Sequence, residues 1–169
     1  LEARGIQLVS FDAPTSIPQL HVPGEMNAMN ARAAVSAARV LGVSEESITA
    51  ALTSFRGIWR RFELLSDADN ILVYSDYGHH PTEIAATLSA ARGYWKGRII
   101  TVFQPHRYSR TVHCKDGFVS AFHDSDQVFI TDIYSAGEDP IDGVHSAALV
   151  NEIKKFATSK QEIHYSGDL

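Results

Sequence analysis

The chain has 169 residues, of which 44% are apolar and 21% charged, as is ordinary for a globular protein. This length is enough for one domain and part of a second. The net charge of -5 and the isoelectric point near 5.9 argue against general binding to nucleic acids or membrane surfaces, which needs a positive field. Cys114 is the single cysteine, so no intramolecular disulfide can form, and a cytoplasmic location is expected.

Two helices are predicted in the first third of the chain. Residues 6–11 and 20–22 have the pattern of short strands, and the start at Leu1 without a methionine indicates a segment of a larger protein. A helix is predicted from Asn27, as its N-cap, to a stop at Gly42. A second helix is predicted from the acidic turn at residues 44–47.

Strands and helices alternate after a boundary at residues 55–59. The expected strands are 61–65, 71–74, 98–103, 127–133 and 162–165. The expected helices are 81–93, 112–123 and 146–156. This alternation predicts an α/β fold with a mostly parallel sheet and right-handed crossovers. The ends of the strands at Tyr74, Phe103 and Ile133 are then expected to open toward one edge of that sheet.

The sequence Asp-Tyr-Gly-His-His at residues 76–80 lies on a predicted strand-to-helix turn. Pro81 follows and suits a first helical turn, because its missing N–H is not needed there. Ligands of open α/β sheets bind at the carboxyl ends of the strands. We therefore interpret this turn as a candidate binding site.

Metal binding and nucleophilic catalysis are weaker interpretations of these residues. Adjacent histidines such as His79 and His80 rarely both face one ion, and no HxxxH, CxxC or DxD pattern accompanies them, so no metal site is predicted. Ser109 and Cys114 could act as nucleophiles in principle. Neither lies in a G-x-S-x-G elbow, and a cysteine in a helix is more typical of a small buried residue.

The loop after the strand at 98–103 is basic, with Arg107 and Arg110 beside His106. Guanidinium groups suit bidentate contacts with carboxylates or phosphates, so this loop is a candidate anion site. The alternative is that these arginines form surface ion pairs. Residues 60 and 61 are both arginine, and the same two interpretations apply to them. No GxxxxGK[ST] or GxGxxG pattern is present, so the main phosphate loop for any nucleotide would lie outside these residues.

Four segments strongly resemble the C-terminal part of the Mur ligases. They are residues 60–63 (RRFE), 76–84 (DYGHHPTEI), 103–111 (FQPHRYSRT) and 134–141 (YSAGEDPI). Residues 22–31 (VPGEMNAMNA) look like the end of the central ATPase domain of that family. The resemblance covers essentially the whole chain, and residues 104–111 favour the alanine-adding branch over the murein-peptide recycling branch.

The resemblance implies a protein of three domains, of which this chain holds parts of two. Residues 1–59 would be the C-terminal remnant of the central ATP-binding domain. Residues 60–169 would be most of the C-terminal, amino-acid-binding domain, a Rossmann-like parallel sheet with helices on both faces. The UDP-sugar domain, the P-loop lysine and the main Mg²⁺ ligands would lie elsewhere in the protein.

The implied reaction is ATP-dependent joining of L-alanine to UDP-N-acetylmuramate in the synthesis of peptidoglycan precursors. ATP would phosphorylate the substrate carboxylate, and the alanine amine would attack the resulting acyl phosphate. The products would be the amide, ADP and phosphate. Residues 1–169 alone are expected to be inactive.

The resemblance also implies which residues bind the nucleotide. Asn27 and Asn30 would contact the adenine, although helix capping is an alternative role for them. Arg61, helped by Arg60, would contact ATP, and Asp76 would bind the ribose hydroxyls.

The remaining implied roles concern the amino acid and the acyl phosphate. Tyr77 and His79 would face these groups. Arg107 and Arg110 would hold the alanine carboxylate and neutralise phosphate charge, with support from His106 and from Tyr108. Of these residues, His79 and the two arginines are the expected catalytic ones, and the role of Glu138 stays open.

Two other functions remain alternatives. One is a non-catalytic Rossmann-like module that binds a nucleotide or a protein partner, since such folds serve many functions. The other is an RNA contact through the loop at residues 106–110, which the acidic net charge disfavours.

Overall fold

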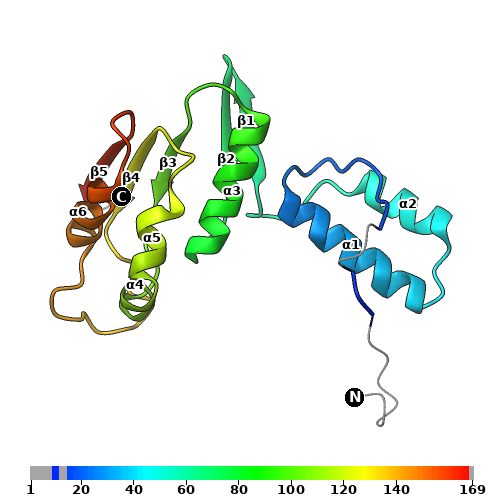
Figure 1. Ribbon diagram of the computed structural model, residues 1–169, viewed down its shortest axis with the longest axis horizontal. Helices are drawn as coiled ribbons and strands as arrows, with labels where there is room; N and C mark the ends of the chain where they lie inside the picture. The colour runs from blue at the N-terminus through cyan, green and yellow to red at the C-terminus, as the bar shows by residue number, and fades with distance from the viewer. Residues whose placement is uncertain (1–8, 12–14, 168–169) are drawn as a thin grey trace, which may run out of the picture. The chain divides into compact units, whose positions relative to one another are not determined.

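The computed structural model describes residues 9–11 and 15–167 and divides into two compact units, 1–75 and 76–169. The helices and strands of both units are labelled in Figure 1. Among the described residues, no helix has the length and apolar character needed to cross a membrane. The boundary expected between residues 59 and 60 remains a prediction.

The first unit contains helices α1 (Glu25–Val40) and α2 (Glu45–Ser54). The N-cap of α1 is Gly24 with φ 101°, so the expectation that Asn27 caps this helix is wrong. Asn27 lies in the first turn, and its side chain donates a hydrogen bond to the Pro23 carbonyl at 2.7 Å. Gly42, with φ 75°, follows the end of α1 as expected. Ser44 caps α2 by accepting a hydrogen bond from the Ser47 N–H.

The two short strands predicted near the N-terminus are absent from the residues that the structure describes. Residues 20–22 form no strand, and residues 9–11 form none either. The other part of the first predicted strand, residues 6–8, lies outside the described residues.

Strands β1 (Glu63–Ala68) and β2 (Ile71–Ser75) form an antiparallel hairpin. Asp69 and Asn70 connect them with φ of 52° and 61°, which is the backbone of a tight two-residue hairpin turn. The expectation that the strand ending at Tyr74 belongs to the parallel sheet is therefore wrong. This turn pairs β2 with its neighbour in sequence, and β2 is not a member of the three-stranded sheet.

The second unit contains a parallel sheet in the order β3–β4–β5, which confirms the α/β prediction. Its elements, in chain order, are α3 (Pro81–Tyr94), β3 (Ile100–Phe103), α4 (Tyr108–His113), α5 (Lys115–Ala121), β4 (Gln127–Thr131), α6 (Ser146–Phe156) and β5 (Glu162–Gly167). The helix predicted over 112–123 is instead two short helices. They meet at Cys114, whose φ of -104° and ψ of 12° interrupt the helical backbone.

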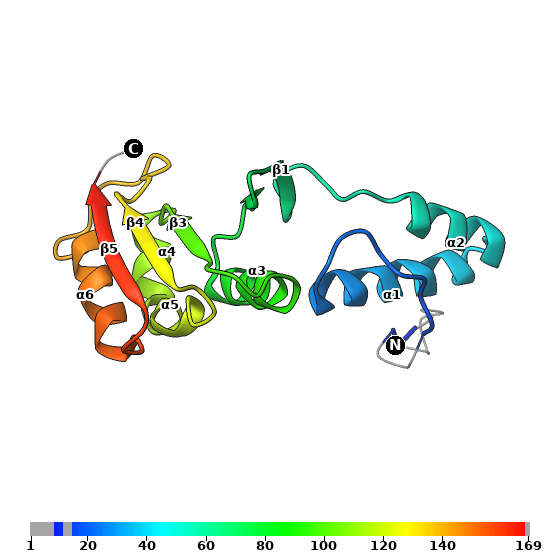
Figure 2. The ribbon, with the colours of Figure 1, turned by 90° about the horizontal axis from the view of Figure 1, so that it is seen from above.

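One hydrophobic core joins the sheet to its helices. Phe103, Val128, Ile130 and Ile163 contribute from the strands. Apolar side chains of α3, α5 and α6 complete the same cluster, and Figure 2 shows these helices on one side of the sheet. The described residues therefore do not show the expected helices on both faces. Val102, which alternates with the buried strand positions, is 63% exposed.

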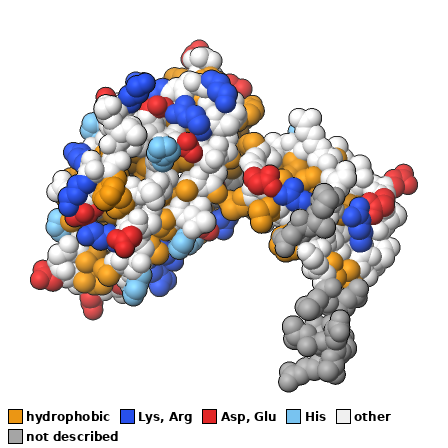
Figure 3. Space-filling view, in the orientation of Figure 1, with side chains coloured by type: hydrophobic (Ala, Val, Ile, Leu, Met, Phe, Trp, Pro, Cys, Tyr) orange, Lys and Arg blue, Asp and Glu red, His pale blue; other side chains and the backbone are white. Residues whose placement is uncertain are grey.

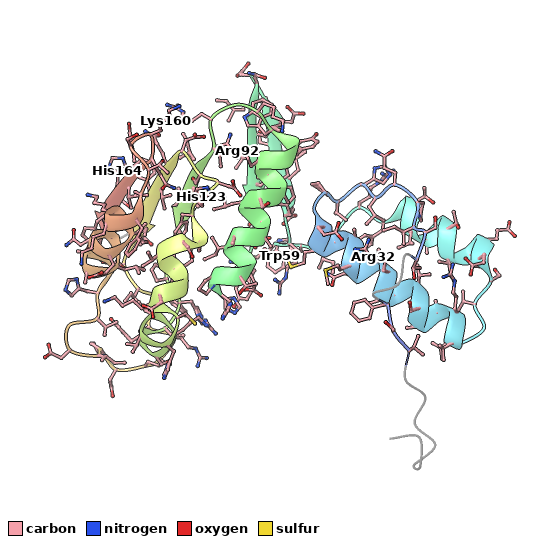
Figure 4. The ribbon with its side chains drawn as sticks, viewed as in Figure 1. Arg32, Trp59, Arg92, His123, Lys160 and His164 are labelled. Atoms are coloured by element: carbon pink, nitrogen blue, oxygen red, sulfur yellow. The ribbon has the colours of Figure 1, made fainter. Side chains whose placement is uncertain are left out.

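The end of α3 is fixed to the loop before β4 by Arg92 (Figure 4). Its guanidinium donates to the Asp124 carbonyl and, at 2.6 Å, to the Asp126 carboxylate. Asp126 also accepts the Ile99 N–H at 2.7 Å, just before β3. These contacts set the position of α3 relative to the sheet. Elsewhere on the visible face of this unit, side chains of both charges are interspersed (Figure 3).

We expect the core to depend strongly on Phe118 of α5, which is 1% exposed and contacts Phe103 with 5.5 Å between ring centroids. Phe118→Ala should lower the free energy of unfolding by about 3–5 kcal/mol, because it removes a buried aromatic ring and leaves a cavity. Phe156→Ala is the matched control, since Phe156 is 71% exposed on α6. Urea unfolding measures both, and equal losses would contradict this description of the core.

Candidate active site

The turn at residues 76–80 is shaped by hydrogen bonds at the start of α3. His80 is the N-cap, and its Nδ1 accepts the Thr82 N–H at 3.3 Å. The Glu83 carboxylate accepts the N–H groups of His79 and His80 at 3.0 and 3.1 Å. This reciprocal arrangement is a capping box, and it fixes the backbone that presents His79.

Asp76 shapes the same turn from its other end. Its Oδ1 accepts the Gly78 N–H at 2.6 Å. A Cβ atom at Gly78 would lie 2.7 Å from that oxygen, so this position requires glycine as long as the hydrogen bond is kept. Asp76 thus has a structural role in the turn in addition to its predicted contact with ribose, which remains a prediction.

The basic loop after β3 is paired with the loop after β4. The Arg107 N–H donates to the Tyr134 carbonyl at 2.8 Å, and the Tyr134 N–H donates to the Pro105 carbonyl at 2.9 Å. These bonds form a parallel bridge between His106 and Tyr134 beyond the ends of the two strands. The side chains at 106–110 are therefore positioned by the sheet.

Four ring side chains from these three segments form a row. Tyr77 meets His79 edge-on, with 5.2 Å between ring centroids. His79 and His106 lie 6.0 Å apart, and His106 and Tyr134 lie 5.5 Å apart, both measured between centroids. The structure thus brings together the two predicted site segments, although β2 is not part of the parallel sheet.

The neighbouring imidazoles differ in which nitrogen carries the proton. His79 Nδ1 lies 2.9 Å from the Tyr77 carbonyl, which can only accept, so neutral His79 is protonated on Nδ1. His106 Nδ1 lies 2.9 Å from Arg110 Nη1, which can only donate, so neutral His106 is protonated on Nε2. In the neutral forms, the Nε2 atom of His79 can therefore accept a hydrogen bond, whereas the Nε2 atom of His106 can donate one.

The surroundings of His106 favour its neutral form. Partial burial lowers the pKa of His106 most, and the positive charges of Arg110 and Arg107 lower it further. Glu138 opposes this shift, but with a smaller effect. A neutral His106 keeps the lone pair that accepts the hydrogen bond from Arg110, and Arg110 also donates to the His106 carbonyl at 3.3 Å.

Arg107 and Glu138 face each other across the two loops. Arg107 Nη1 lies 3.9 Å from Glu138 Oε1, and the Arg107 side chain is about half exposed. Hydrogen bonds from the side chain and the backbone of Ser109 lower the pKa of Glu138, and Arg107 adds to this effect. Glu138 is therefore a carboxylate at neutral pH. The predicted site residue Tyr108 starts α4 beside them and is partly buried.

The other predicted nucleotide-binding residues belong to the first unit. Asn27 and Asn30 lie three residues apart on α1, hence on one face of that helix, and Asn30 is exposed. Arg61 is also exposed, and its N–H donates to the Ile58 carbonyl at 3.0 Å. Arg60 lies over the Trp59 ring at 5.7 Å. The roles of these residues remain predictions.

The residues considered for metal binding and for nucleophilic catalysis have the following surroundings. In the described ranges, no group of three or more His, Cys, Asp or Glu side chains could hold a metal ion. Cys114 packs against the core of the second unit. Ser109 donates its hydroxyl hydrogen to Glu138 at 2.6 Å, and a carboxylate in this position orients the serine side chain.

Sequence reasoning missed three residues that shape the site. Glu83 could have been found, because its position three residues after His80 is that of a capping box. Ser109 and Tyr134 could not have been found in this way, because each contacts a residue of a different loop. Ser109 and Glu138, for example, are 29 residues apart in the sequence. No local pattern indicates such contacts.

The family model for the Mur ligase, glutamate ligase domain, matches residues 60–169. The chain belongs to the Mur ligase family. The UDP-N-acetylmuramate–L-alanine ligase of Agrobacterium fabrum is 51% identical over 135 residues, which are 80% of this chain and 29% of that protein. The enzyme of the same name from Pelotomaculum thermopropionicum is 51% identical over 152 residues, with 86% of this chain and 33% of that protein covered. The chain thus spans about 30% of the length of these relatives.

Solved Mur ligase structures have the same fold. The UDP-N-acetylmuramate–alanine ligase of Thermotoga maritima matches with a TM-score of 0.69 and 30% identity, covering 88% of this chain and 30% of that one. A murein peptide ligase of Psychrobacter arcticus matches with a TM-score of 0.51 and 25% identity, covering 89% and 35%. The likeness to the first is greater by both measures.

The pKa of His106 tests the geometry of this site. Arg110→Met should raise this pKa toward its ordinary value, because a positive charge that opposes protonation is removed. NMR titration of the imidazole in both proteins measures the shift. Arg98→Met is the control, since Arg98 does not contribute to the shift of His106. A His106 pKa that falls or stays the same in Arg110→Met would contradict the contact.

Proposed function

We propose that this chain is part of an ATP-dependent ligase that joins L-alanine to UDP-N-acetylmuramate, forming peptidoglycan precursors in the cytoplasm. The observation that carries this proposal is the cluster of Arg107, Arg110, His106 and His79 in a chain about half identical to proteins named for that activity. Because the chain spans only about 30% of those proteins, the activity is assigned to the full-length protein.

The basic loop is proposed to bind the anionic groups of the reaction. Arg107 has an exposed guanidinium, and three residues later the guanidinium of Arg110 is held by His106. They would bind the alanine carboxylate and stabilise the charge that develops on the phosphate oxygens as the acyl phosphate reacts. Donors held in place before the reaction need no reorganisation in the transition state. Tyr108 would line this pocket.

His79 is proposed to assist the attacking amine. In the proposed reaction, the amine nitrogen attacks the acyl carbon, the carbon–oxygen bond to phosphate breaks, and a proton leaves the nitrogen. His79 has its Nε2 lone pair available as an acceptor for that proton, because Nδ1–H points at the Tyr77 carbonyl. Tyr77, which is exposed next to His79, would contact the amino acid.

The nucleotide is proposed to contact Asn27 and Asn30 at the adenine, Asp76 at the ribose and Arg61 at the phosphates. Amide groups can pair with the edge of adenine, and a carboxylate can accept from ribose hydroxyls. Mg²⁺ would neutralise phosphate charge when bound. Its main ligands are proposed to lie in other parts of the protein, as the family resemblance implies.

The murein-peptide recycling ligases are the second candidate, because a member of that group has the same fold. The two functions differ in the amino component, which is a free amino acid in one and a peptide in the other. The loop at 104–111 and the higher identity to the alanine-adding enzymes favour the first.

The proposed reaction predicts that the full-length protein releases ADP only when UDP-N-acetylmuramate and L-alanine are both present. A coupled ADP assay with a panel of amino acids and a murein tripeptide measures this. Residues 1–169 alone should release none, because they contain no P-loop. Turnover by these residues alone would refute the domain assignment, and a preference for the tripeptide would favour the recycling ligase.

Arg110→Ala in the full-length enzyme should raise the KM for L-alanine and lower kcat, each by on the order of tenfold, with little change in the KM for ATP. The reason is loss of a positioned charge that faces the amino acid and the phosphate. Steady-state kinetics with each substrate varied in turn provides the measurement. Arg98→Ala is the matched control, because Arg98 is an exposed arginine just before β3. An unaltered KM for alanine would remove Arg110 from the proposed role.

A further inference from the structure

Glu138 directs both of its carboxylate oxygens at one residue of the neighbouring loop. Its Oε2 accepts the Ser109 N–H at 2.9 Å, and its Oε1 accepts the Ser109 hydroxyl at 2.6 Å. The side chain of Glu138 is only 26% exposed, although it lies in a surface loop. A carboxylate held in this way fixes the start of α4, where Ser109 is the second residue.

Arg107, two residues before Ser109, has a backbone that requires such support. Its φ of 72° and ψ of 137° are sparsely populated by residues other than glycine, and they persist only where the surroundings enforce them. On the N-terminal side, the Arg107 N–H is held by the Tyr134 carbonyl. On the C-terminal side, the Arg107 carbonyl accepts the N–H and hydroxyl of Thr111, at 3.1 and 2.9 Å. Through Ser109, Glu138 adds a further connection between this segment and the loop after β4.

The side chain of Arg107 stays available for an anion. The separation of 3.9 Å between Arg107 Nη1 and Glu138 Oε1 is longer than a hydrogen bond. Glu138 therefore attracts the guanidinium without occupying its donors. The strong hydrogen bonds of Glu138 go to Ser109 instead, so its charge stays beside Arg107 when an anion binds.

The loop that carries Glu138 is itself in a defined shape. Ala136 and Gly137 have φ of 49° and 85°, which reverses the chain just before Glu138. The Glu138 N–H then closes the turn by donating to the Ser135 carbonyl at 3.1 Å. The turn begins beside Tyr134, whose backbone pairs with Arg107. One short loop thus holds Arg107 from one side and Ser109 from the other.

We propose that Glu138 is a positioning residue that holds Arg107 in the conformation that binds a carboxylate or phosphate group. It acts through Ser109 and does not contact the substrate. This inference rests on the proposed function only in taking Arg107 as an anion-binding group. The loop after β4 therefore supports the anion site without contacting the nucleotide or the amino acid.

The test uses the full-length enzyme with Glu138→Gln, Ser109→Ala and the double variant. Glutamine keeps the size of the side chain, but it loses the negative charge, and its amide nitrogen cannot accept from Ser109. Glu152→Gln is the matched control, because Glu152 is a carboxylate on α6 paired with Lys155 at 3.0 Å. Three quantities are measured: hydrogen exchange in the peptide covering 106–111, the kinetic constants for L-alanine and ATP, and the affinity for inorganic phosphate.

We expect Glu138→Gln to speed exchange in that peptide and to raise the KM for alanine by roughly tenfold, since a misplaced binding group costs about this much or more. The KM for ATP should change little. The double variant should be no worse than Glu138→Gln alone, because both changes break the same contact. Glu152→Gln should leave the three quantities as they are in the unmodified enzyme.

Two results would overturn the proposal. Unchanged exchange in Glu138→Gln would mean that the contact with Ser109 does not order the loop. Faster exchange with unchanged alanine kinetics and unchanged phosphate affinity would make Glu138 a purely structural residue. Should the unmodified enzyme fail to use alanine, the proposed function fails, and weaker phosphate binding by Glu138→Gln would still support the role of Glu138.

Discussion

The candidate site depends on the parallel pairing of β3 and β4, which continues beyond the ends of both strands. Arg107 and Tyr134 extend that pairing by two backbone hydrogen bonds, of 2.8 and 2.9 Å, into the loops that follow the two strands. The strands are held in turn by Phe103, Ile130 and the helices packed on them. Since the loop backbones follow the strands, the geometry of the basic side chains follows from the register of the sheet.

This arrangement also explains how two arginines can lie next to two histidines. Positive charges close together repel, and a protonated imidazole would add to that repulsion. Partial burial and Arg110 lower the pKa of His106, which keeps the ring neutral and able to accept from Arg110. Glu138 supplies the opposite charge beside Arg107. The site therefore concentrates positive charge on guanidinium groups, which stay charged at physiological pH.

Sequence patterns predicted most helices and the parallel strands well, because these elements are determined by residues close together in the sequence. Helix α6 has the bounds expected from its sequence, Pro81 starts α3, and Gly42 follows the end of α1. The failures have causes of another kind. Asp69 and Asn70 adopt a tight turn that pairs β2 with β1, and Cys114 interrupts a helix for which no local signal was evident. The contact of Ser109 with Glu138 spans 29 residues, a separation at which sequence patterns carry no information.

The two halves of the site differ in what maintains them. The turn at 76–80 is held by hydrogen bonds between residues two to four positions apart, such as those of Asp76 and Glu83. The loop at 105–110 is held mainly by contacts with residues 134–138, which exist only when the sheet is formed. Loss of packing between strands should therefore affect Arg107 before it affects the backbone at His79. The half of the site that we propose to bind anions is therefore the part whose geometry depends on an intact parallel sheet.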